Sequence, residues 1–121
     1  MASHLEKESK EFVKLLMVMK KLRDPENGCP WDLDQTHQSI RSNLLEETYE
    51  ALEALDLNNR DMMVEELGDV LFQIIFHSQI AQDDQTFGIY DVLAGVVSKL
   101  ITRHPHVFGD PEKITTENVL F

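Results

Sequence analysis

Apolar residues recur at helical spacing through four stretches of the chain, with polar or turn-forming residues between them. The first stretch begins near Ser3, whose spacing to Glu6 is that of a reciprocal N-cap pair, and it stops before Asp24-Pro25. Thr36 is a suitable N-cap for a second helix that runs to about Leu57. The pattern therefore predicts helices, and not strands, in the first half of the chain.

The second half follows the same pattern. Asp61 is placed to cap a third helix that runs to about Gln82, and the middle of that helix, from Val70 to Phe76, is apolar on nearly every side. A helix of this kind is buried over most of its surface. A fourth helix is expected from about Ile89 to Arg103, because the following His104-Pro105 pair ends a helix.

The remaining segments read as connections. Residues 24–32 contain two prolines and an Asn-Gly pair, which is typical of an ordered loop. Residues 107–121 read as a loop followed by the first turn of another helix. Four helices and no convincing strand predict an all-α, four-helix-bundle-like domain that covers residues 1–121. A chain of 121 residues has a modest core, so we expect oligomerisation to complete it.

The net charge of the chain limits the kinds of molecule that it is expected to bind. Lys and Arg number 11 against 22 Asp and Glu, a formal charge of −11, which argues against binding to duplex nucleic acid or to an anionic membrane. No apolar run reaches the roughly 18 residues that span a bilayer. The start lacks a signal peptide's apolar core, and the single cysteine, Cys29, suggests a reducing compartment, so a cytoplasmic location is expected. An acidic chain still binds a nucleotide when divalent cations lie between the two.

Six of the carboxylates on the second and third predicted helices lie close together in the sequence. They lie three or four residues apart within each helix, which puts members of each set on one helical face. Exposed helices often carry acids at this spacing, so a solvated acidic face is the alternative interpretation. The six residues are Glu46, Glu47, Glu50, Glu65, Glu66 and Asp69.

The turn between these helices adds information about register. If they form an antiparallel hairpin about position 58, Glu50 and Glu66 each lie eight residues from that point. Glu47 and Asp69 each lie eleven residues from it, so two acidic pairs face each other one turn apart. Four converging carboxylates repel one another unless cations lie among them. Ligands that are all oxygen suit Mg²⁺ or Mn²⁺.

A polar stripe on the third helix favours the same interpretation. Glu66, Asp69, Gln73 and His77 share one side of an otherwise apolar cylinder. Burying unpaired carboxylates is costly, so the stripe is expected to line a wet or metal-filled site. His77 lies two turns beyond Asp69 and is expected to be a core or interface histidine rather than a ligand. A ferritin-like di-iron site would need Glu-x-x-His on two helices, and the chain has none.

The acidic residues also carry a resemblance. Glu46-Glu47-Thr48-Tyr49-Glu50 followed by Glu66-Leu67-Gly68-Asp69 resembles the signature of the MazG-type, all-α nucleoside triphosphate pyrophosphohydrolases. The blocks Gly28-Cys29-Pro30-Trp31 and His104-Pro105-His106-Val107-Phe108 match the same family, and the similarity covers roughly Phe12 to Asp110. It is strongest to the first of the two MazG domains that longer members carry. The chain is therefore expected to be one MazG-like domain, either complete or a fragment of a two-domain protein.

The resemblance implies an activity. Members hydrolyse a nucleoside triphosphate to the monophosphate and pyrophosphate in sanitation of the nucleotide pool, and they require Mg²⁺, for which Mn²⁺ is a possible substitute. By motif position, Glu47, Glu50, Glu66 and Asp69 resemble the metal ligands. Glu46 would then orient or deprotonate the attacking water.

The resemblance also suggests residues that hold the substrate. Lys99 and Arg103, four apart on the fourth helix, match a Lys-x-x-x-Arg pair that contacts the nucleotide, although a solvated helix end is the alternative. Asn43 falls at a nucleotide-contact position where relatives often carry a basic residue. Trp31 is a candidate for stacking on a base, with a packing role as the alternative. Nothing in the sequence decides whether Arg41 or His37 reaches the site from the start of the second helix.

The predicted assembly is a homodimer or homotetramer, because one short hairpin cannot enclose a nucleotide. Two other functions stay open. The first is a catalytically silent regulatory or dimerisation module of a longer protein. A lesser alternative is a dUTPase-like nucleotide hydrolase, which activity on dUDP would reveal. Base preference depends on loop geometry that the sequence does not give.

Overall fold

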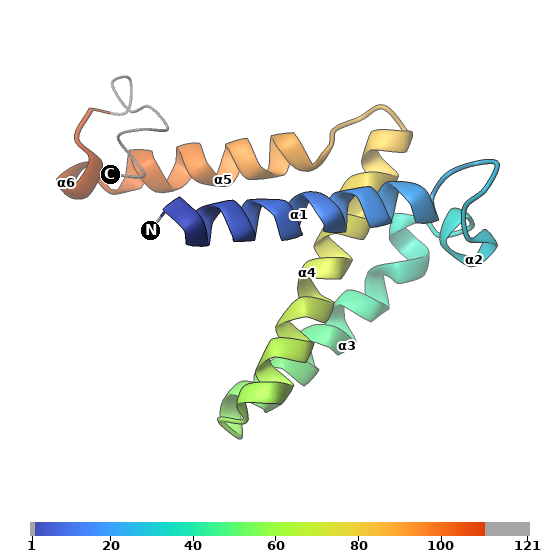
Figure 1. Cartoon of the computed structure of the whole chain (residues 1–121), viewed down its shortest axis with the longest axis horizontal. Helices are drawn as coiled ribbons and strands as arrows, with labels where there is room; N and C mark the ends of the chain where they lie inside the picture. Colours follow the sequence, from blue (N-terminus) through green and yellow to red (C-terminus); the bar gives the residue numbers. More distant parts are fainter. Residues whose placement is uncertain (1, 111–121) are drawn as a thin grey trace.

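The computed structural model describes residues 2–110, and the chain is helical there with no strand. The predicted all-α class is confirmed, and the four long helices match the predicted segments. Two further one-turn helices lie in segments that were predicted to be loops. Figure 1 shows the order α1 (Ala2–Leu22), α2 (Pro30–Leu33), α3 (His37–Asp56), α4 (Arg60–Asp83), α5 (Ile89–Arg103) and α6 (Pro105–Phe108). The expectation for residues 111–121 falls outside the described residues.

Two of the predicted helix starts are wrong. Helix α1 already includes Ser3, which therefore does not cap it. Helix α4 is capped by Asn59, whose side chain accepts a hydrogen bond of 3.1 Å from the backbone N–H of Met62, and Asp61 lies in the first turn. Asn and Asp are nearly equal as N-caps, so residue type alone does not choose between them. Thr36 caps α3 as predicted.

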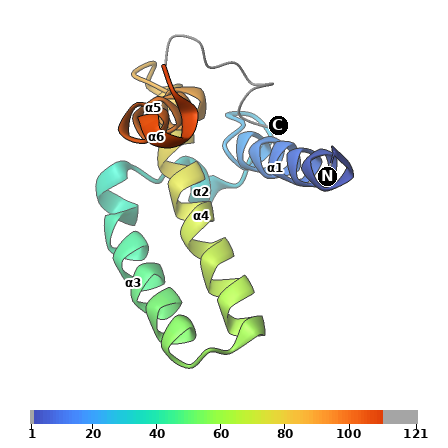
Figure 2. The same ribbon diagram turned by 90° about the vertical axis from the view of Figure 1, so that its left-hand side faces the viewer.

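Helices α3 and α4 form the antiparallel hairpin that was predicted about position 58. Helix α3 ends at Asp56, and α4 begins at Arg60. Asn58 lies in the turn with a φ of 51°, in the left-handed region that Asn tolerates better than most residues. Figure 2 shows the two helices side by side, joined at the lower end by this turn. The turn therefore fixes which residues of α3 and α4 face each other.

The core lies at the other end of the hairpin, where α1 meets α4. Its buried residues come from α1, α3 and α4, and they are Met19, Ile40, Ile75, Phe76 and Ile80. Phe12, Leu15, Leu16, Leu22, Phe72 and Ile89 are half-buried against them. The hairpin turn and the segment that carries the acidic residues project beyond this core (Figure 2).

Hydrogen bonds of the Arg23 side chain connect the loop between α1 and α3 to the end of α4. Its Nε donates to Asp83 Oδ2 at 2.9 Å, and its Nη1 donates to the carbonyl oxygens of Asp32 and Gln35 at 2.7 and 3.2 Å. In the same loop, a Cβ on Gly28 would lie 2.5 Å from the carbonyl oxygen of Leu22, so only glycine fits. The start of α3 is therefore held in a defined position.

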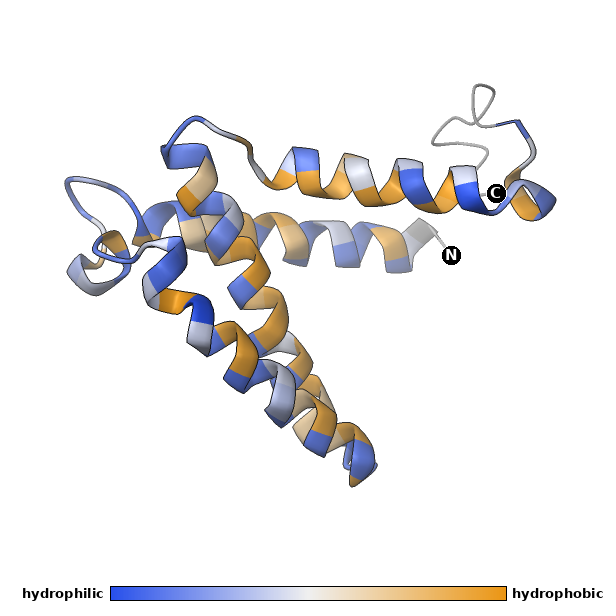
Figure 3. Ribbon diagram, turned by 180° about the vertical axis from the view of Figure 1, so that it is seen from behind, coloured by the Kyte–Doolittle hydropathy of each residue, from blue (hydrophilic) through white to orange (hydrophobic). Residues whose placement is uncertain are grey.

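Helices α1 and α5 extend away from the hairpin on one side and run antiparallel (Figures 1 and 2). The four-helix arrangement is consequently open, because only α3 and α4 lie together along their whole length. No residue of α5 is buried, although the helix is rich in apolar residues. Figure 3 shows these apolar residues along one edge of α5, on the side of the hairpin. No helix within residues 2–110 is long and apolar enough to cross a membrane.

Candidate functional site

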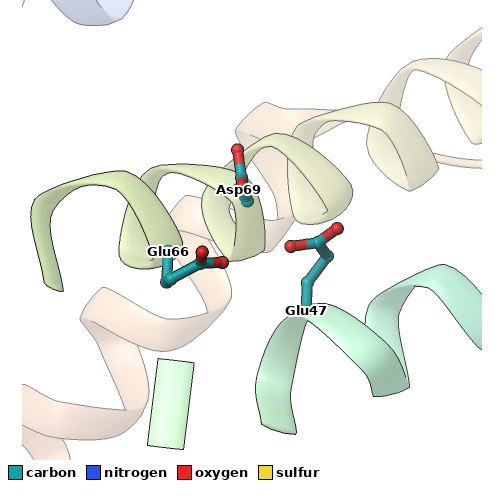
Figure 4. Close-up of side chains that lie close together, drawn as sticks. All are labelled: Glu47, Glu66 and Asp69. Atoms are coloured by element: carbon teal, nitrogen blue, oxygen red, sulfur yellow. The ribbon is translucent and has the colours of Figure 1, made fainter. Parts of the chain in front are cut away.

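Three carboxylates from the two hairpin helices converge midway along α3 and α4. Glu47 comes from α3, and Glu66 and Asp69 come from α4 (Figure 4). Each offers one oxygen atom, and these oxygens lie within 4.8 Å of one another. The carboxylates of Glu47 and Glu66 are turned toward each other in Figure 4, with Asp69 beside them. The hairpin register predicted from position 58 thus brings Glu47 and Asp69 together.

Glu50 belongs to the same group of side chains. Its hydrogen bonding and charge raise the pKa values of both Glu47 and Glu66, so its side chain lies beside theirs, from the next turn of α3. We call Glu47, Glu50, Glu66 and Asp69 the carboxylate cluster. Glu46 is exposed on α3, and its charge acts on Glu47.

The protein environment raises the pKa values of two carboxylates in this cluster. Burial raises the pKa of Glu66 from 4.5 to about 7, and the hydrogen bond and charge of Glu50 add to the rise, as do the charges of Asp69 and Glu47. Burial and then the charges of Glu50 and Asp69 also raise the pKa of Glu47. These shifts favour protonation, which a nearby cation would oppose.

Two oxygens of the cluster have no hydrogen-bond partner within the described residues, 2–110. Glu47 Oε2 and Glu66 Oε2 are buried and accept no hydrogen bond. A buried carboxylate oxygen without a partner is costly, and a cation removes that cost. The donors are all carboxylate oxygens on two helices, which is the chemistry that Mg²⁺ and Mn²⁺ prefer, whereas zinc favours nitrogen and sulfur. The residues present therefore fit a divalent cation of the magnesium type.

A histidine pair joins α3 and α4 nearer the core. The Nδ1 atoms of His37 and His77 lie 2.8 Å apart, and the two ring planes differ by 3°. The ring centroids are 5.1 Å apart, farther than the Nδ1 atoms, so the rings meet edge to edge and share a hydrogen bond. Burial lowers the pKa of His77 below its ordinary value of 6.5, and the charge of His37 adds to the lowering.

The position of His37 was left open in the sequence analysis, although the hairpin register contains a signal for it. His37 and His77 lie at almost equal distances from position 58, so the hairpin register places them nearly opposite each other. Between this pair and the carboxylate cluster lies Gln73, which is buried on α4. His77 was predicted to be a core or interface histidine, and its ring does contact another helix.

The structure does not join all of the predicted substrate residues to the cluster. Asn43 is half-buried on α3, one turn before Glu47, and so lies on the same side of that helix. Lys99 and Arg103 are exposed near the far end of α5, which runs away from the hairpin (Figure 1). No contact between either cation and the carboxylate cluster is present in residues 2–110 of one chain.

Trp31 lies on the surface of α2 and packs against the core. Its side chain is 56% exposed, and its ring meets that of Phe76 edge to face, with centroids 6.3 Å apart. This contact supports a packing role for one edge of the indole. The exposed part of the ring stays available to a ligand.

Comparisons with known proteins agree with the geometry. Residues 35–108 match the family described as MazG nucleotide pyrophosphohydrolase domain. The chain is 57% identical over 99 residues to the nucleoside triphosphate pyrophosphohydrolase/pyrophosphatase MazG of Thermotoga maritima, covering 82% of this chain and 38% of that protein. It is 48% identical over 107 residues to the nucleoside triphosphate pyrophosphohydrolase of Escherichia coli K12, covering 88% and 41%.

A third relative is the uncharacterized protein YabN of Bacillus subtilis. The identity there is 50% over 108 residues, covering 89% of this chain and 22% of that protein. The chain thus spans about two fifths of the first two relatives and about a fifth of the third. These proteins contain long segments that the present chain does not match.

Proposed function

The chain belongs to the MazG nucleotide pyrophosphohydrolase family, and we propose that it hydrolyses nucleoside triphosphates to the monophosphate and pyrophosphate. The observation that carries this proposal is the carboxylate cluster between α3 and α4, with its two unpartnered oxygens. The proposed cofactor is Mg²⁺, with Mn²⁺ as a substitute. The proposed cellular role is removal of unwanted nucleotides from the pool.

The residues that would hold the cation are Glu47, Glu50, Glu66 and Asp69. When bound, a divalent cation neutralises phosphate charge, lowers the pKa of a nearby water and favours in-line attack. Both helices are held by the core and the hairpin turn, so the four side chains stay in register without help from substrate. This preorganisation is what a phosphoryl site needs, because positioning supplies most of the rate enhancement.

Glu46 is the proposed base. It stands beside Glu47 on α3 and is exposed, so a water molecule has access to it. In the proposed reaction, the water oxygen bonds to the α-phosphorus while the bond from that phosphorus to the bridging oxygen breaks. Pyrophosphate leaves, and the proton of the water passes to Glu46.

The remaining substrate contacts are proposed from the family resemblance. Asn43 would contact the nucleotide beside the cluster, and the open edge of Trp31 would meet a base. Lys99 and Arg103 would contact phosphate oxygens. Because α5 leaves the hairpin with its apolar edge exposed, we propose that the working unit is a homodimer or homotetramer in which this edge is covered.

One observation favours a second candidate function. The matched region is less than half of each relative described above, so part of their activity can reside outside that region. On this alternative, the domain binds metal and nucleotide without turnover and regulates or assembles a longer enzyme.

Pyrophosphate release tests the proposal and separates the two candidates. The assay uses ribo- and deoxyribonucleoside triphosphates with Mg²⁺ or with EDTA. We expect release only with Mg²⁺, and its loss in Glu50→Gln. Glu53→Gln is the matched control, since Glu53 is exposed on the same helix outside the cluster. Nucleotide binding without pyrophosphate release from any substrate would favour the regulatory module.

A further inference from the structure

The polar side chains between α3 and α4 form a row, with one member on each successive turn of α4. It begins with the carboxylate cluster and continues through Gln73 to the pair of His77 and His37; we call this row the polar seam. Gln73 lies four residues after Asp69 and four before His77, and both of those residues meet side chains of α3. Residues four apart share a helix face, so Gln73 is directed toward α3 as well.

Gln73 is buried without the hydrogen bonds that it needs. Its side chain is only 7% exposed, and its Oε1 atom has no donor among residues 2–110. The next polar residue along the seam repeats the pattern, because His77 Nε2 is also buried without a partner. Native proteins satisfy nearly all such groups, so two neighbouring exceptions indicate that a bound molecule supplies the partners.

The seam differs in charge from one end to the other. Toward the hairpin turn it consists of carboxylates that fit divalent cations, and toward the core it consists of an amide and a histidine pair. This second end has no carboxylate, and burial favours the neutral form of His77. A nucleoside triphosphate has the same division, since its phosphates are ionic and its nucleoside is neutral and rich in hydrogen-bonding groups.

Spacing along α4 is consistent with such a ligand. Gln73 lies about 6 Å beyond Asp69 along the helix axis, and His77 lies about 12 Å beyond it. The nucleoside is joined directly to the α-phosphate, so it must occupy the part of the seam next to the carboxylates.

We propose that Gln73 and His77 form the nucleoside subsite of this protein. Gln73 Oε1 accepts a hydrogen bond from the nucleoside, and His77 Nε2 makes a second contact farther from the phosphates. This inference rests on the proposed function, because it assumes that the carboxylate cluster receives the phosphates. It adds residues that determine how the substrate is recognised.

The test compares binding of nucleoside triphosphates with binding of inorganic tripolyphosphate, which has phosphates but no nucleoside. Titration calorimetry with Mg²⁺ uses tripolyphosphate and the α,β-methylene analogues of ATP, GTP, CTP and UTP, in which a P–C bond replaces the bond that the proposed reaction breaks. The proteins are the wild type, Gln73→Met and Gln38→Met. Met keeps the length of the glutamine side chain without its amide. Gln38 is exposed on α3, so its substitution is the matched control.

We expect Gln73→Met to weaken binding of at least one nucleoside triphosphate by about fivefold, the effect of losing one hydrogen bond, and to leave tripolyphosphate binding unchanged. The melting temperature should stay the same or rise, since an unpaired buried amide is removed. His77→Phe, which keeps a ring, provides a second variant with the same expected selectivity. Gln38→Met should bind every probe as the wild type does.

Equal weakening of all probes, unchanged binding of all probes, or a wild type that binds tripolyphosphate as tightly as every nucleotide would overturn the subsite. Failure of the proposed hydrolysis gives a different result. In that case no pyrophosphate is released, while the difference between nucleotide and tripolyphosphate binding still decides the role of Gln73.

Discussion

Glu66 combines a buried, unpartnered oxygen with three acidic neighbours. Its pKa of about 7 in the folded chain is higher than the 4.5 of an ordinary glutamate. The folded state therefore holds a proton on Glu66 between these values, and the stability that this proton contributes is lost as the pH rises through 7. In the absence of metal, ionised Glu66 thus opposes folding above neutral pH.

Replacing this carboxylate should relieve the repulsion. We expect metal-free Glu66→Gln to melt at a higher temperature than the wild type at pH 8, with a smaller difference at pH 6. Thermal melts in EDTA measure the effect. Glu65→Gln is the control, because Glu65 is exposed on the same helix, and a similar gain in that variant would show that the stabilisation comes from net charge alone.

Cations should have the opposite effect on the wild type. A ligand that binds only the folded state stabilises it by about 2.7 kcal/mol at a hundred times its dissociation constant. We expect Mg²⁺ or Mn²⁺ to raise the melting temperature, EDTA to reverse the rise, and Glu66→Gln to reduce it. A rise of equal size in Glu66→Gln would place the cation elsewhere.

His77 should make stability depend on pH in a lower range. Its pKa is lowered by burial, so an unfolded chain takes up a proton near pH 6.5 that the folded chain excludes. The contribution of neutral His77 is complete above pH 6.5 and is lost as the pH falls below it. Urea unfolding should show that lowering the pH from 7.5 to 5.5 reduces the free energy of unfolding more in the wild type than in His77→Phe. An unchanged difference between the two proteins would contradict this expectation.

At the scale of the elements, helical periodicity predicts the four long helices well because each has an apolar side at regular spacing. The one-turn helices α2 and α6 are too short to show a period. They begin with Pro30 and Pro105, whose fixed φ suits the first position of a helix. The start of α4 was missed because Asn59 and Asp61 are both good caps.

The register of the α3–α4 hairpin was predictable because the turn between the two helices is short. A tight turn at Asn58 makes distance along the chain equivalent to height on the hairpin, which brings Glu47 opposite Asp69. No such rule applies to α5, whose direction depends on the tertiary geometry of residues 84–88. The positions of Lys99 and Arg103 relative to the cluster therefore did not follow from the sequence. The unpaired atom of Gln73 likewise depends on which side chains surround it.

The loop between α1 and α2 gives a test of local geometry. We expect Gly28→Ala to destabilise the fold by about 2 kcal/mol, because the added Cβ meets backbone carbonyls that cannot move independently. Gly68→Ala is the matched control. Apart from its chain neighbours and the nearby backbone of α4, no described atom lies within 4 Å of the Cβ that it would add, and it should stabilise the helix by about 1 kcal/mol. Urea unfolding of both variants checks the contrast, and equal effects would contradict it.

For the whole molecule, the dominant feature is apolar surface that residues 2–110 of one chain leave uncovered. Helix α5 has no buried residue, and its exposed apolar side chains are Tyr90, Val92, Leu93, Val96, Val97 and Leu100. Their number on one short helix exceeds the scattered apolar residues of an ordinary monomer surface. The open arrangement of α1, α5 and the hairpin would become enclosed on association with a second chain.

A charge placed on this edge should prevent association. We expect Val97→Glu to lower the molar mass measured by light scattering after gel filtration, from a dimer or larger to a monomer, because a buried carboxylate is costly. Ser98→Glu adds the same charge at a polar, exposed position on the same helix and should leave the mass unchanged. A wild-type monomer would contradict the proposed assembly.

The contact between His37 and His77 has a further consequence for what the protein can recognise. In a neutral pair, one Nδ1 carries the shared proton and the other accepts it. A ring that donates through Nδ1 has a bare Nε2, whereas a ring that accepts through Nδ1 is protonated at Nε2. The two tautomeric arrangements have the same charge, so the group that meets His77 Nε2 selects between them. One histidine pair can therefore match either a donor or an acceptor with no net gain or loss of a proton.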